Sequence, residues 1–305
     1  MLAMKDGRRL YVEHHRNQKE HTILIIHGGP GESCITFGRL AEELAPYADV
    51  VLVDQRGVLR SGREPDPLKI NVRQVVLDFE DIRRQLKMES WAVLGHSFGG
   101  RVALSYAAWF PRQVEAVVLE NPAIDIRTSL QSLLGSYRKL YEEMPGRCAD
   151  LEGQKQALEE AARSGDMHKQ LAYLAQIPAR YRCICFGNDT LDQDSQALFQ
   201  YPGFGPGDIK KCRDVSAAFL QDPGLEQEGA RILEGVSCPI LLLRDAKDPM
   251  LTEEEARLIR ERGQEIRMEG GSHYLHLKEP GKVSEWIGGF LHGDETGKNH
   301  PAGNP

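Results

Sequence analysis

Residues 91–109, WAVLGHSFGGRVALSYAAW, place an apolar strand, a sharp turn and a helix one after another along the chain. The middle of this stretch, residues 95–99, fits the pattern G-x-S-x-G, a strained strand-to-helix turn that exposes a serine hydroxyl above a sheet. The flanking glycines avoid side-chain clashes, and the dipole of the following helix favours a developing negative charge beside Ser97. We therefore predict that Ser97 is a nucleophile. The alternative, an ordinary Gly/Ser turn, does not account for the strand and the helix on either side.

Short apolar segments alternate with helical segments on both sides of this turn. The expected strands are residues 10–14, 22–27, 50–54, 91–95, 114–120, 239–244 and 265–268, and the expected helices of this alternation are 37–44, 71–88, 99–109 and 282–292, with a further one opening at Thr252. Asn71 and Thr252 are the expected N-caps. Continuous apolar strands separated by helices are typical of a parallel sheet covered on both faces, so we predict the α/β class.

The alternation stops after Pro122 and resumes only at Pro239. Helices are expected between these points at residues 128–143, 150–163 and 168–175, together with a loop rich in Gly and Pro at 201–207. We predict a core formed by residues 1–122 and 231–292, with a helical lid, residues 123–230, inserted after the sixth strand. Residues 293–305 are polar and rich in Gly and Pro, which predicts a disordered tail.

A serine hydroxyl needs a base, and the base needs a group that orients it. Two residues that follow later strands can supply them, Asp248 as the orienting acid and His273 as the base. They occur in the chain order Ser, acid, His that is usual when the serine lies in a G-x-S-x-G turn. The carboxyl ends of parallel strands meet at one edge of the sheet, so we expect Asp248 and His273 beside Ser97. Asp245 and His276 are the alternatives. Asp245 directly follows its strand and is expected in the turn, whereas His276 lies closer to the final helix.

Residues 27–31, HGGPG, follow a buried strand and form a second glycine-rich turn. Its glycines let the backbone approach a reacting carbonyl and present N–H groups to an oxyanion. The other expected donor is the backbone N–H of Phe98, which directly follows the predicted nucleophile. His27 is expected to be structural. On its own, HGGPG would also fit an ordinary Gly/Pro turn.

With these motifs the sequence resembles the proline iminopeptidase-like branch of the α/β-hydrolases, a group of serine aminopeptidases. The resemblance covers residues 8–122 and 236–292 and rests on HGGPG at 27–31, DQRG at 54–57 with Ser61 after it, GHSFGG at 95–100, KDP at 247–249 and GSHYLHLKEP at 271–280. It implies an α/β-hydrolase fold with a mostly parallel sheet, a triad of Ser97, Asp248 and His273, and an oxyanion hole formed by the N–H groups of Gly29 and Phe98. It also implies that Asp54 and Arg56 tie loops together.

The sequence departs from that branch at two places. Residues 58–61 are VLRS, where the branch has a Cys-Gly-x-Ser run after DQRG, and Phe98 stands where it usually has Trp. GHSFGG is equally typical of esterases, lactonases and C–C-bond hydrolases of the same fold. The resemblance therefore implies the fold and the triad, and it does not extend to specificity for proline.

The amino-acid composition of the chain argues against some classes of binding partner. The chain has 305 residues and a net charge of −7 with no basic patch, which argues against a nucleic-acid partner. Neither a signal-peptide core nor a membrane-spanning apolar stretch is evident, and the six cysteines are scattered. We expect a soluble cytoplasmic protein with a small-molecule or short-peptide substrate, no metal and no organic cofactor. The sequence leaves its oligomeric state open.

The predicted lid contains several aromatic residues that could line an apolar pocket or hold the lid together: Tyr137, Tyr141, Tyr173, Tyr181, Phe199, Tyr201 and Phe204. An aminopeptidase also needs a carboxylate for the substrate ammonium. Glu120, at the end of a strand, is one candidate for this role, and a salt bridge at the lid hinge is the competing interpretation.

The pattern favours acyl transfer through Ser97, with three possible uses. The first is an aminopeptidase that acts on short peptides or aminoacyl amides. The second is an esterase or lactonase that acts on a small acyl substrate. The third is a ligand-binding protein on a hydrolase scaffold, which the complete Ser–Asp–His set makes the least favourable.

Overall fold

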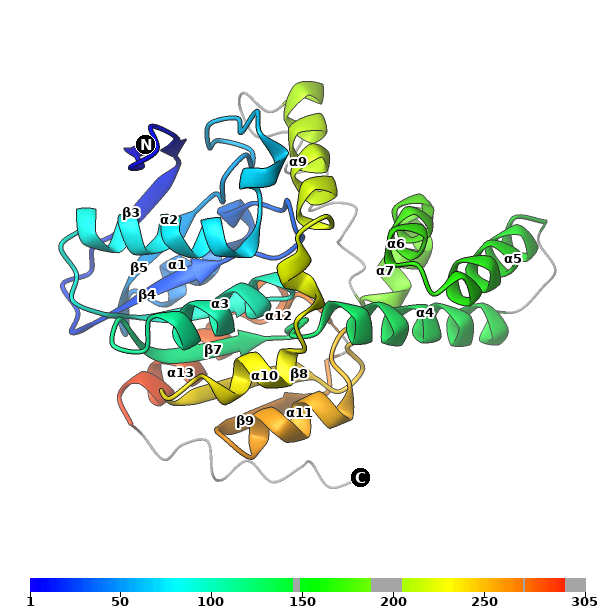
Figure 1. Ribbon diagram of the computed structural model, residues 1–305. Coiled ribbons are helices and arrows are strands. Elements are labelled where there is room, and N and C mark those ends of the chain that lie inside the picture. The colour runs from blue at the N-terminus through cyan, green and yellow to red at the C-terminus, as the bar shows by residue number, and fades with distance from the viewer. Residues whose placement is uncertain (145–148, 188–204, 271, 294–305) are drawn as a thin grey trace, which may run out of the picture.

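The computed structural model describes residues 1–144, 149–187, 205–270 and 272–293. Its centre is a seven-stranded sheet with the strand order β3-β5-β4-β6-β7-β8-β9 (Figure 1). The strands are β3 (Val12–His15), β4 (His21–Ile26), β5 (Ala48–Val53), β6 (Trp91–His96), β7 (Val114–Glu120), β8 (Ile240–Asp245) and β9 (Gln264–Met268). Only β3 pairs antiparallel within this described sheet. The mostly parallel α/β sheet expected from the sequence is therefore confirmed.

Both faces of the sheet are covered, because its strands are apolar on both sides. Along β4, Ile23 and Ile25 belong to one hydrophobic cluster, whereas Leu24 and Ile26 belong to the other. The cluster that contains Leu24 and Ile26 also contains residues of α2 (Val72–Gln85), α3 (Phe98–Trp109), α10 (Gly229–Glu234) and α11 (Glu253–Arg260). The opposite face packs against α1 (Gly38–Glu43), α12 (Leu275–Lys278) and α13 (Pro280–Leu291).

The helix starts follow the capping signals in the sequence. The side chain of Asn71 accepts a hydrogen bond of 2.8 Å from the N–H of Gln74 at the start of α2. Thr252 and Glu255 form a reciprocal capping box at the start of α11. Each side chain satisfies a backbone N–H that has no partner inside the helix, and so fixes where the helix begins.

The N-terminal strand differs from the prediction. Residues 10–14 do not form one strand, because β2 (Arg9–Leu10) pairs with β1 (Leu2–Ala3) in a separate two-stranded sheet and β3 begins at Val12. The strand before the inserted helices, β7, is the fifth strand of the main sheet along the described chain, whereas the lid was expected after a sixth strand.

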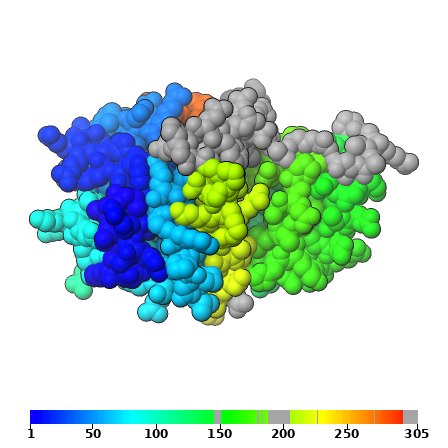
Figure 2. Space-filling model, turned by 90° about the horizontal axis from the view of Figure 1, so that it is seen from above, coloured from blue at the N-terminus to red at the C-terminus, as the bar shows by residue number. Residues whose placement is uncertain are grey.

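Several helices lie between β7 and β8 along the chain. They are α4 (Ile126–Glu143), α5 (Ala149–Ser164), α6 (Met167–Gln176), α7 (Ala179–Cys185) and α9 (Pro206–Phe219), followed by the short η3 (Pro223–Glu226) and α10. The first four described ones, α4 to α7, extend to one side of the sheet (Figure 1). Two further short helices, η1 (Cys34–Phe37) and η2 (Pro67–Lys69), lie in the first third of the chain. Figure 2 shows α9, in yellow-green, between the N-terminal part of the chain and the green inserted helices. The predicted division into core and lid stays a prediction, and the predicted disordered tail lies, except for Gly293, outside the described residues.

None of the described helices is both long enough and apolar enough to cross a bilayer.

Candidate active site

Ser97 lies in the turn between β6 and α3 with a backbone conformation that few non-glycine residues adopt. Its φ is 50° and its ψ is −122°. The turn requires its two flanking glycines. A Cβ at Gly99 would lie 2.2 Å from the carbonyl oxygen of Ile26, and a Cβ at Gly95 would lie 2.4 Å from the carbonyl oxygen of Gly99. This geometry is the strained strand-to-helix turn that the sequence pattern predicts.

Asp248 and His273 meet although 25 residues separate them along the chain. Asp248 follows β8 and His273 follows β9, two neighbouring strands that end at the same edge of the sheet. The Nδ1 atom of His273 lies 2.5 Å from Oδ2 of Asp248, and the imidazole is 3% exposed. Asp248 rather than Asp245 is therefore the carboxylate that contacts this imidazole.

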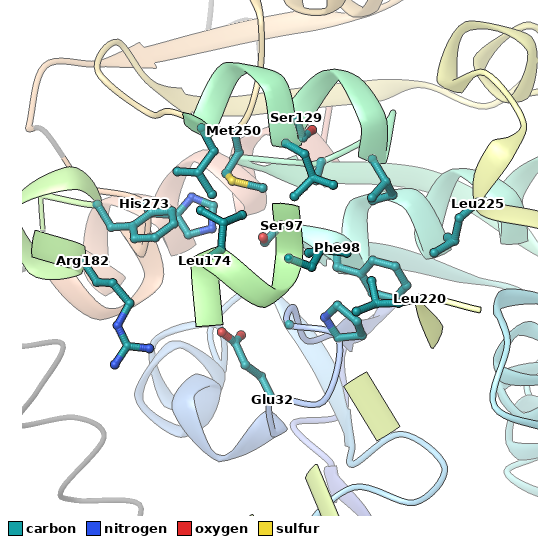
Figure 3. A pocket seen from close by; sticks show the side chains of 18 of the residues that line it. Glu32, Ser97, Phe98, Ser129, Leu174, Arg182, Leu220, Leu225, Met250 and His273 are labelled. Atoms are coloured by element: carbon teal, nitrogen blue, oxygen red, sulfur yellow. The ribbon is translucent and has the colours of Figure 1, made fainter. Parts of the chain in front are cut away.

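Ser97 and His273 line the same cavity, which has a volume of about 250 Å³ (Figure 3). Among the described residues, the side chains of Ser97 and His273 form no hydrogen bond with each other. Because Nδ1 of His273 is engaged by Asp248, Nε2 is the nitrogen left to act as a base toward Ser97. In the absence of substrate, catalytic hydrogen bonds are often long or poorly aligned, so this arrangement is compatible with a serine–histidine pair.

Charges around His273 favour its protonated form. Burial by itself would lower the pKa of His273, but the neighbouring Asp248 carboxylate, with smaller contributions from Glu32 and Glu120, raises that pKa above its ordinary value. The pKa of His96 shifts in the opposite direction. Burial, together with the nearby His273 and His276, holds the pKa of His96 well below its ordinary value. His96 therefore stays neutral and adds no positive charge beneath the nucleophile.

The residues of the two predicted oxyanion donors, Gly29 and Phe98, line the same cavity as Ser97. Phe98 is the first residue of α3, and the N–H groups of a first helical turn have no partner inside the helix. Gly29 has a φ of +111°, and a Cβ there would lie 2.6 Å from the backbone nitrogen of Gly31, so this position requires glycine. The role of both amides stays a prediction.

His27 is structural, as expected, and the DQRG segment ties loops together, as the family resemblance implies. Gln55 N–H donates to Nε2 of His27 over 3.1 Å, and Nδ1 of His27 lies 3.0 Å from the carbonyl oxygen of Gly28. Asp54 accepts from the Ser33 hydroxyl, the Cys34 N–H and the guanidinium of Arg60. The buried Arg56 contacts Asp78, Asp6 and Glu64, which joins the loop after β5 to α2 and to the N-terminus.

Glu120 does not lie where a substrate-binding residue is needed. Its side chain is fully buried, and it accepts hydrogen bonds from the N–H of His276 over 3.0 Å and from the imidazole Nδ1 over 2.7 Å. It is absent from the described cavity wall. The expectation that Glu120 binds substrate is therefore wrong in geometry, because the end of β7 points this side chain under the sheet edge and toward α12. His276, the alternative base, is stacked on Phe37 and pairs with Glu120 instead of facing Ser97.

Aliphatic side chains from the inserted helices form most of the cavity wall. The apolar lining residues between β7 and β8 are Ala123, Ile126, Leu130, Leu133, Leu171, Leu174, Phe186, Leu220 and Leu225. Pro30, Phe98 and Met250 add apolar surface from outside this insertion. The lid tyrosines Tyr137, Tyr141, Tyr173 and Tyr181 instead pack together between the inserted helices. These tyrosines therefore hold the inserted helices together, which is one of the two roles that the sequence left open for them. The other aromatic candidates, Phe199, Tyr201 and Phe204, lie outside the described residues.

Four polar residues of the cavity wall were not among the residues expected from the sequence, namely Glu32, Ser129, Arg182 and Tyr274. The Tyr274 hydroxyl donates to Oε1 of Glu32 over 3.1 Å. Burial, followed by the charge of Glu32, raises the pKa of Tyr274 well above its ordinary value, so the hydroxyl stays protonated and can donate. A local signal existed for two of them, because Glu32 directly follows HGGPG and Tyr274 directly follows His273.

Comparisons with known proteins agree with the described fold. Residues 21–280 match the family model described as the alpha/beta hydrolase fold. A proline iminopeptidase from Xylella fastidiosa (strain Temecula1 / ATCC 700964) is 36% identical over 121 residues, which are 40% of this chain and 38% of that protein. The chain thus spans about two fifths of the length of that relative.

Two solved structures show the same fold over nearly the whole chain. The crystal structure of a proline iminopeptidase from Mycobacterium smegmatis superposes with a TM-score of 0.70 and 18% identity, covering 96% of this chain and 97% of that one. An esterase from Exiguobacterium antarcticum superposes with a TM-score of 0.65 and 17% identity, covering 95% and 98%. At these identities the superpositions establish the fold alone. Together with the family match over most of its length, they identify the chain as a member of the α/β-hydrolase family.

Proposed function

We propose that this protein is a serine hydrolase that forms an acyl-enzyme on Ser97. The observation that supports this most directly is the contact of 2.5 Å between His273 and Asp248, made beside a cavity that also exposes the strained Ser97 turn. An oriented imidazole next to a serine on such a turn is the arrangement that activates a hydroxyl as a nucleophile.

The reaction proceeds in two halves. Ser97 Oγ attacks the substrate carbonyl while Nε2 of His273 takes the hydroxyl proton, and Asp248 stabilises the resulting imidazolium. The N–H groups of Gly29 and Phe98 hold the oxyanion, and the leaving group departs with the proton that His273 returns. Water then attacks the acyl carbonyl and loses a proton to His273. As the ester bond to Ser97 breaks, His273 returns that proton to Ser97 Oγ and the acid is released.

An aminopeptidase acting on short peptides or aminoacyl amides is the use that we favour, and Glu32 supports it. In such a substrate the ammonium is one carbon away from the scissile carbonyl, so a carboxylate must lie close to the nucleophile. Glu32 Oε2 and Ser97 Cβ each lie 3.0 Å from the position that a Cβ at Gly28 would occupy. The distance between Glu32 Oε2 and Ser97 Cβ is therefore at most twice 3.0 Å. Figure 3 shows Glu32 extending toward the cavity that Ser97 and His273 also line. The Xylella fastidiosa relative is named a proline iminopeptidase, which supports the same class of reaction.

Replacing Glu32 with glutamine tests this assignment. The glutamine keeps an oxygen that can accept from the Tyr274 hydroxyl but has no charge for an ammonium. A hydrogen bond to a charged group contributes about 1.5–3 kcal/mol, so we expect kcat/KM for an aminoacyl amide to fall roughly 10- to 100-fold. The matched measurement is hydrolysis of an uncharged p-nitrophenyl ester, which should fall far less. Equal losses on both substrates would contradict an ammonium-binding role.

The cavity wall supports a second candidate. Apart from Glu32 and the reacting groups it is mainly aliphatic, which suits the acyl group of an uncharged ester or lactone. A panel of prolyl amides, other aminoacyl amides and p-nitrophenyl esters separates the two functions. Cleavage of esters without any cleavage of aminoacyl amides would reject the aminopeptidase and leave the ester hydrolase.

The charges around His273 predict the acid limb of the pH profile. Catalysis requires a neutral imidazole, and the Asp248 carboxylate keeps the pKa of His273 above its ordinary value. As the pH falls through this raised pKa, His273 becomes protonated and kcat/KM declines. We therefore expect the midpoint of the acid limb to lie above the ordinary histidine value of about 6.5. A midpoint well below that value, measured with a substrate that does not titrate in this range, would contradict the described charge environment.

A further inference from the structure

One short segment at the end of β7, residues 120–123, contacts all three loops of the proposed triad through hydrogen bonds. The N–H of Ser97 donates to the carbonyl oxygen of Glu120 over 3.1 Å, and the N–H of Ala123 donates to the carbonyl oxygen of Ser97 over 2.9 Å. These two bonds hold the backbone of the nucleophile from both sides. Asn121, which lies between Glu120 and Ala123, reaches the other two loops.

The side chain of Asn121 joins the loop of the acid to the loop of the base. Its Nδ2 donates to the carbonyl oxygen of Ser272 over 3.0 Å and to that of His273 over 2.8 Å. Its Oδ1 accepts from the N–H of Asp245, over 2.8 Å, at the end of β8 and three residues before Asp248. Both amide hydrogens and the amide oxygen are therefore used, and no other side chain of this size and shape offers two donors and an acceptor in the same plane.

Asn121 is fully buried and is not among the residues that line the cavity. Its φ of 39° lies in the left-handed region, where asparagine is tolerated better than most residues. Its backbone N–H also donates to the carbonyl oxygen of Leu243 in β8, over 2.9 Å. A residue held this firmly away from the cavity can influence the reaction only through the loops that it positions.

We propose that Asn121 is a positioning residue that sets the distance between Asp248 and His273 by clamping their two loops to the end of β7. This inference rests on the proposed function, because it assumes that the 2.5 Å contact between these two side chains orients the base. Asp248 and His273 follow different strands, and β8 separates β7 from β9 in the sheet. A bridge from β7 to the base loop therefore crosses a neighbouring strand, and the Asn121 side chain provides it.

The clamp matters for rate because catalytic geometry is demanding. A misplacement of about 1 Å in a catalytic group can cost on the order of 100-fold in rate. Without the two donors of Asn121, the carbonyl oxygens of Ser272 and His273 lose their tie to β7, and the imidazole can shift relative to both Asp248 and Ser97. Substrate binding should change little, because Asn121 does not reach the cavity.

Two variants of the full chain test the clamp. Asn121→Gly removes all three side-chain bonds and suits the left-handed backbone, whereas Asn121→Asp keeps the acceptor for Asp245 N–H and removes both donors to the base loop. We expect kcat to fall roughly 10- to 100-fold in each, with KM little changed. The rate at which a fluorophosphonate labels Ser97 should fall in parallel, and the downfield proton resonance of the His273–Asp248 hydrogen bond should weaken or disappear.

Asn17→Asp is the matched control. The Nδ2 of Asn17 also ties a loop to a strand, since it donates to the carbonyl oxygen of Ala48 over 2.9 Å, but at the amino end of β5, far from the carboxyl ends of the strands. Its kcat, labelling rate and downfield resonance should match those of the wild type. Thermal melting establishes which variants are folded, and either folded Asn121 variant is sufficient for the comparison.

The outcomes separate the clamp from the proposed function. Wild-type labelling and kcat in a folded Asn121 variant would overturn the clamp while leaving the serine hydrolase intact. A loss confined to KM would also overturn it, because it would place Asn121 in binding. A wild-type protein that neither reacts with the fluorophosphonate nor cleaves any substrate of the panel would instead overturn the proposed function.

Discussion

Replacing Ser97 with alanine is expected to reduce hydrolysis by on the order of 10⁶-fold in kcat, the loss typical of removing a serine nucleophile that works with an oriented histidine. The hydroxyl oxygen is the atom that becomes acylated, so neither His273 nor Asp248 can compensate for its removal. The measurement is steady-state turnover of the best substrate from the panel, combined with fluorophosphonate labelling followed by mass spectrometry. Labelling should disappear in Ser97→Ala, and in the wild type the added mass should be on the peptide that contains Ser97.

The matched control is Ser105→Ala on the same helix. Ser105 is a buried serine of α3 whose hydroxyl donates to the carbonyl oxygen of Arg101 over 2.9 Å, away from the cavity. Its removal should leave turnover and labelling close to those of the wild type. The fold of Ser97→Ala should be intact, because Ser97 Oγ has no hydrogen bond to another described side chain. Near-normal turnover in Ser97→Ala would remove Ser97 from the mechanism.

Replacing Asp248 with asparagine has the second largest expected effect, a loss on the order of 10⁴-fold in kcat. Asparagine nearly matches aspartate in shape, but its amide can donate a hydrogen bond to Nδ1 of His273. The proton of a neutral imidazole then moves to Nε2, which is the atom that must accept the proton from Ser97. The variant also loses the carboxylate that keeps the pKa of His273 raised. Any residual activity should therefore have its acid limb at lower pH than in the wild type.

Asp245→Asn provides the comparison for Asp248→Asn. Asp245 ends β8, its Oδ1 accepts from the N–H of Lys247 over 2.9 Å, and an asparagine oxygen can accept the same bond. We expect a much smaller loss of kcat than in Asp248→Asn. Equal losses in the two variants, or a larger loss in Asp245→Asn, would contradict the assignment of Asp248 as the group that orients His273.

Parts of the site that depend on local sequence could be predicted. The turn at Ser97 shows its strand, its glycines and its helix within 19 residues, so the nucleophile is visible without any tertiary information. Asp248 and His273 follow clear strand signals, and the known order of the three residues along the chain selects them. The same rule, that residues at strand ends face the site, wrongly selects Glu120. It also ends a strand, but a position at a strand end does not say whether the side chain faces the cavity or the protein interior.

The sequence by itself determined the α/β class, the strained turn at Ser97 and the candidates Asp248 and His273, because these follow from periodicity, glycine placement and strand ends within short windows. Only the tertiary structure decided which distant residues meet. The strand order, the leucine-lined cavity, the Glu32–Tyr274 contact and the Asn121 clamp all bring together residues that are far apart along the chain. Such contacts depend on how strands align and how inserted helices pack across them, and the hydrophobic pattern of one segment carries no record of its neighbours in space.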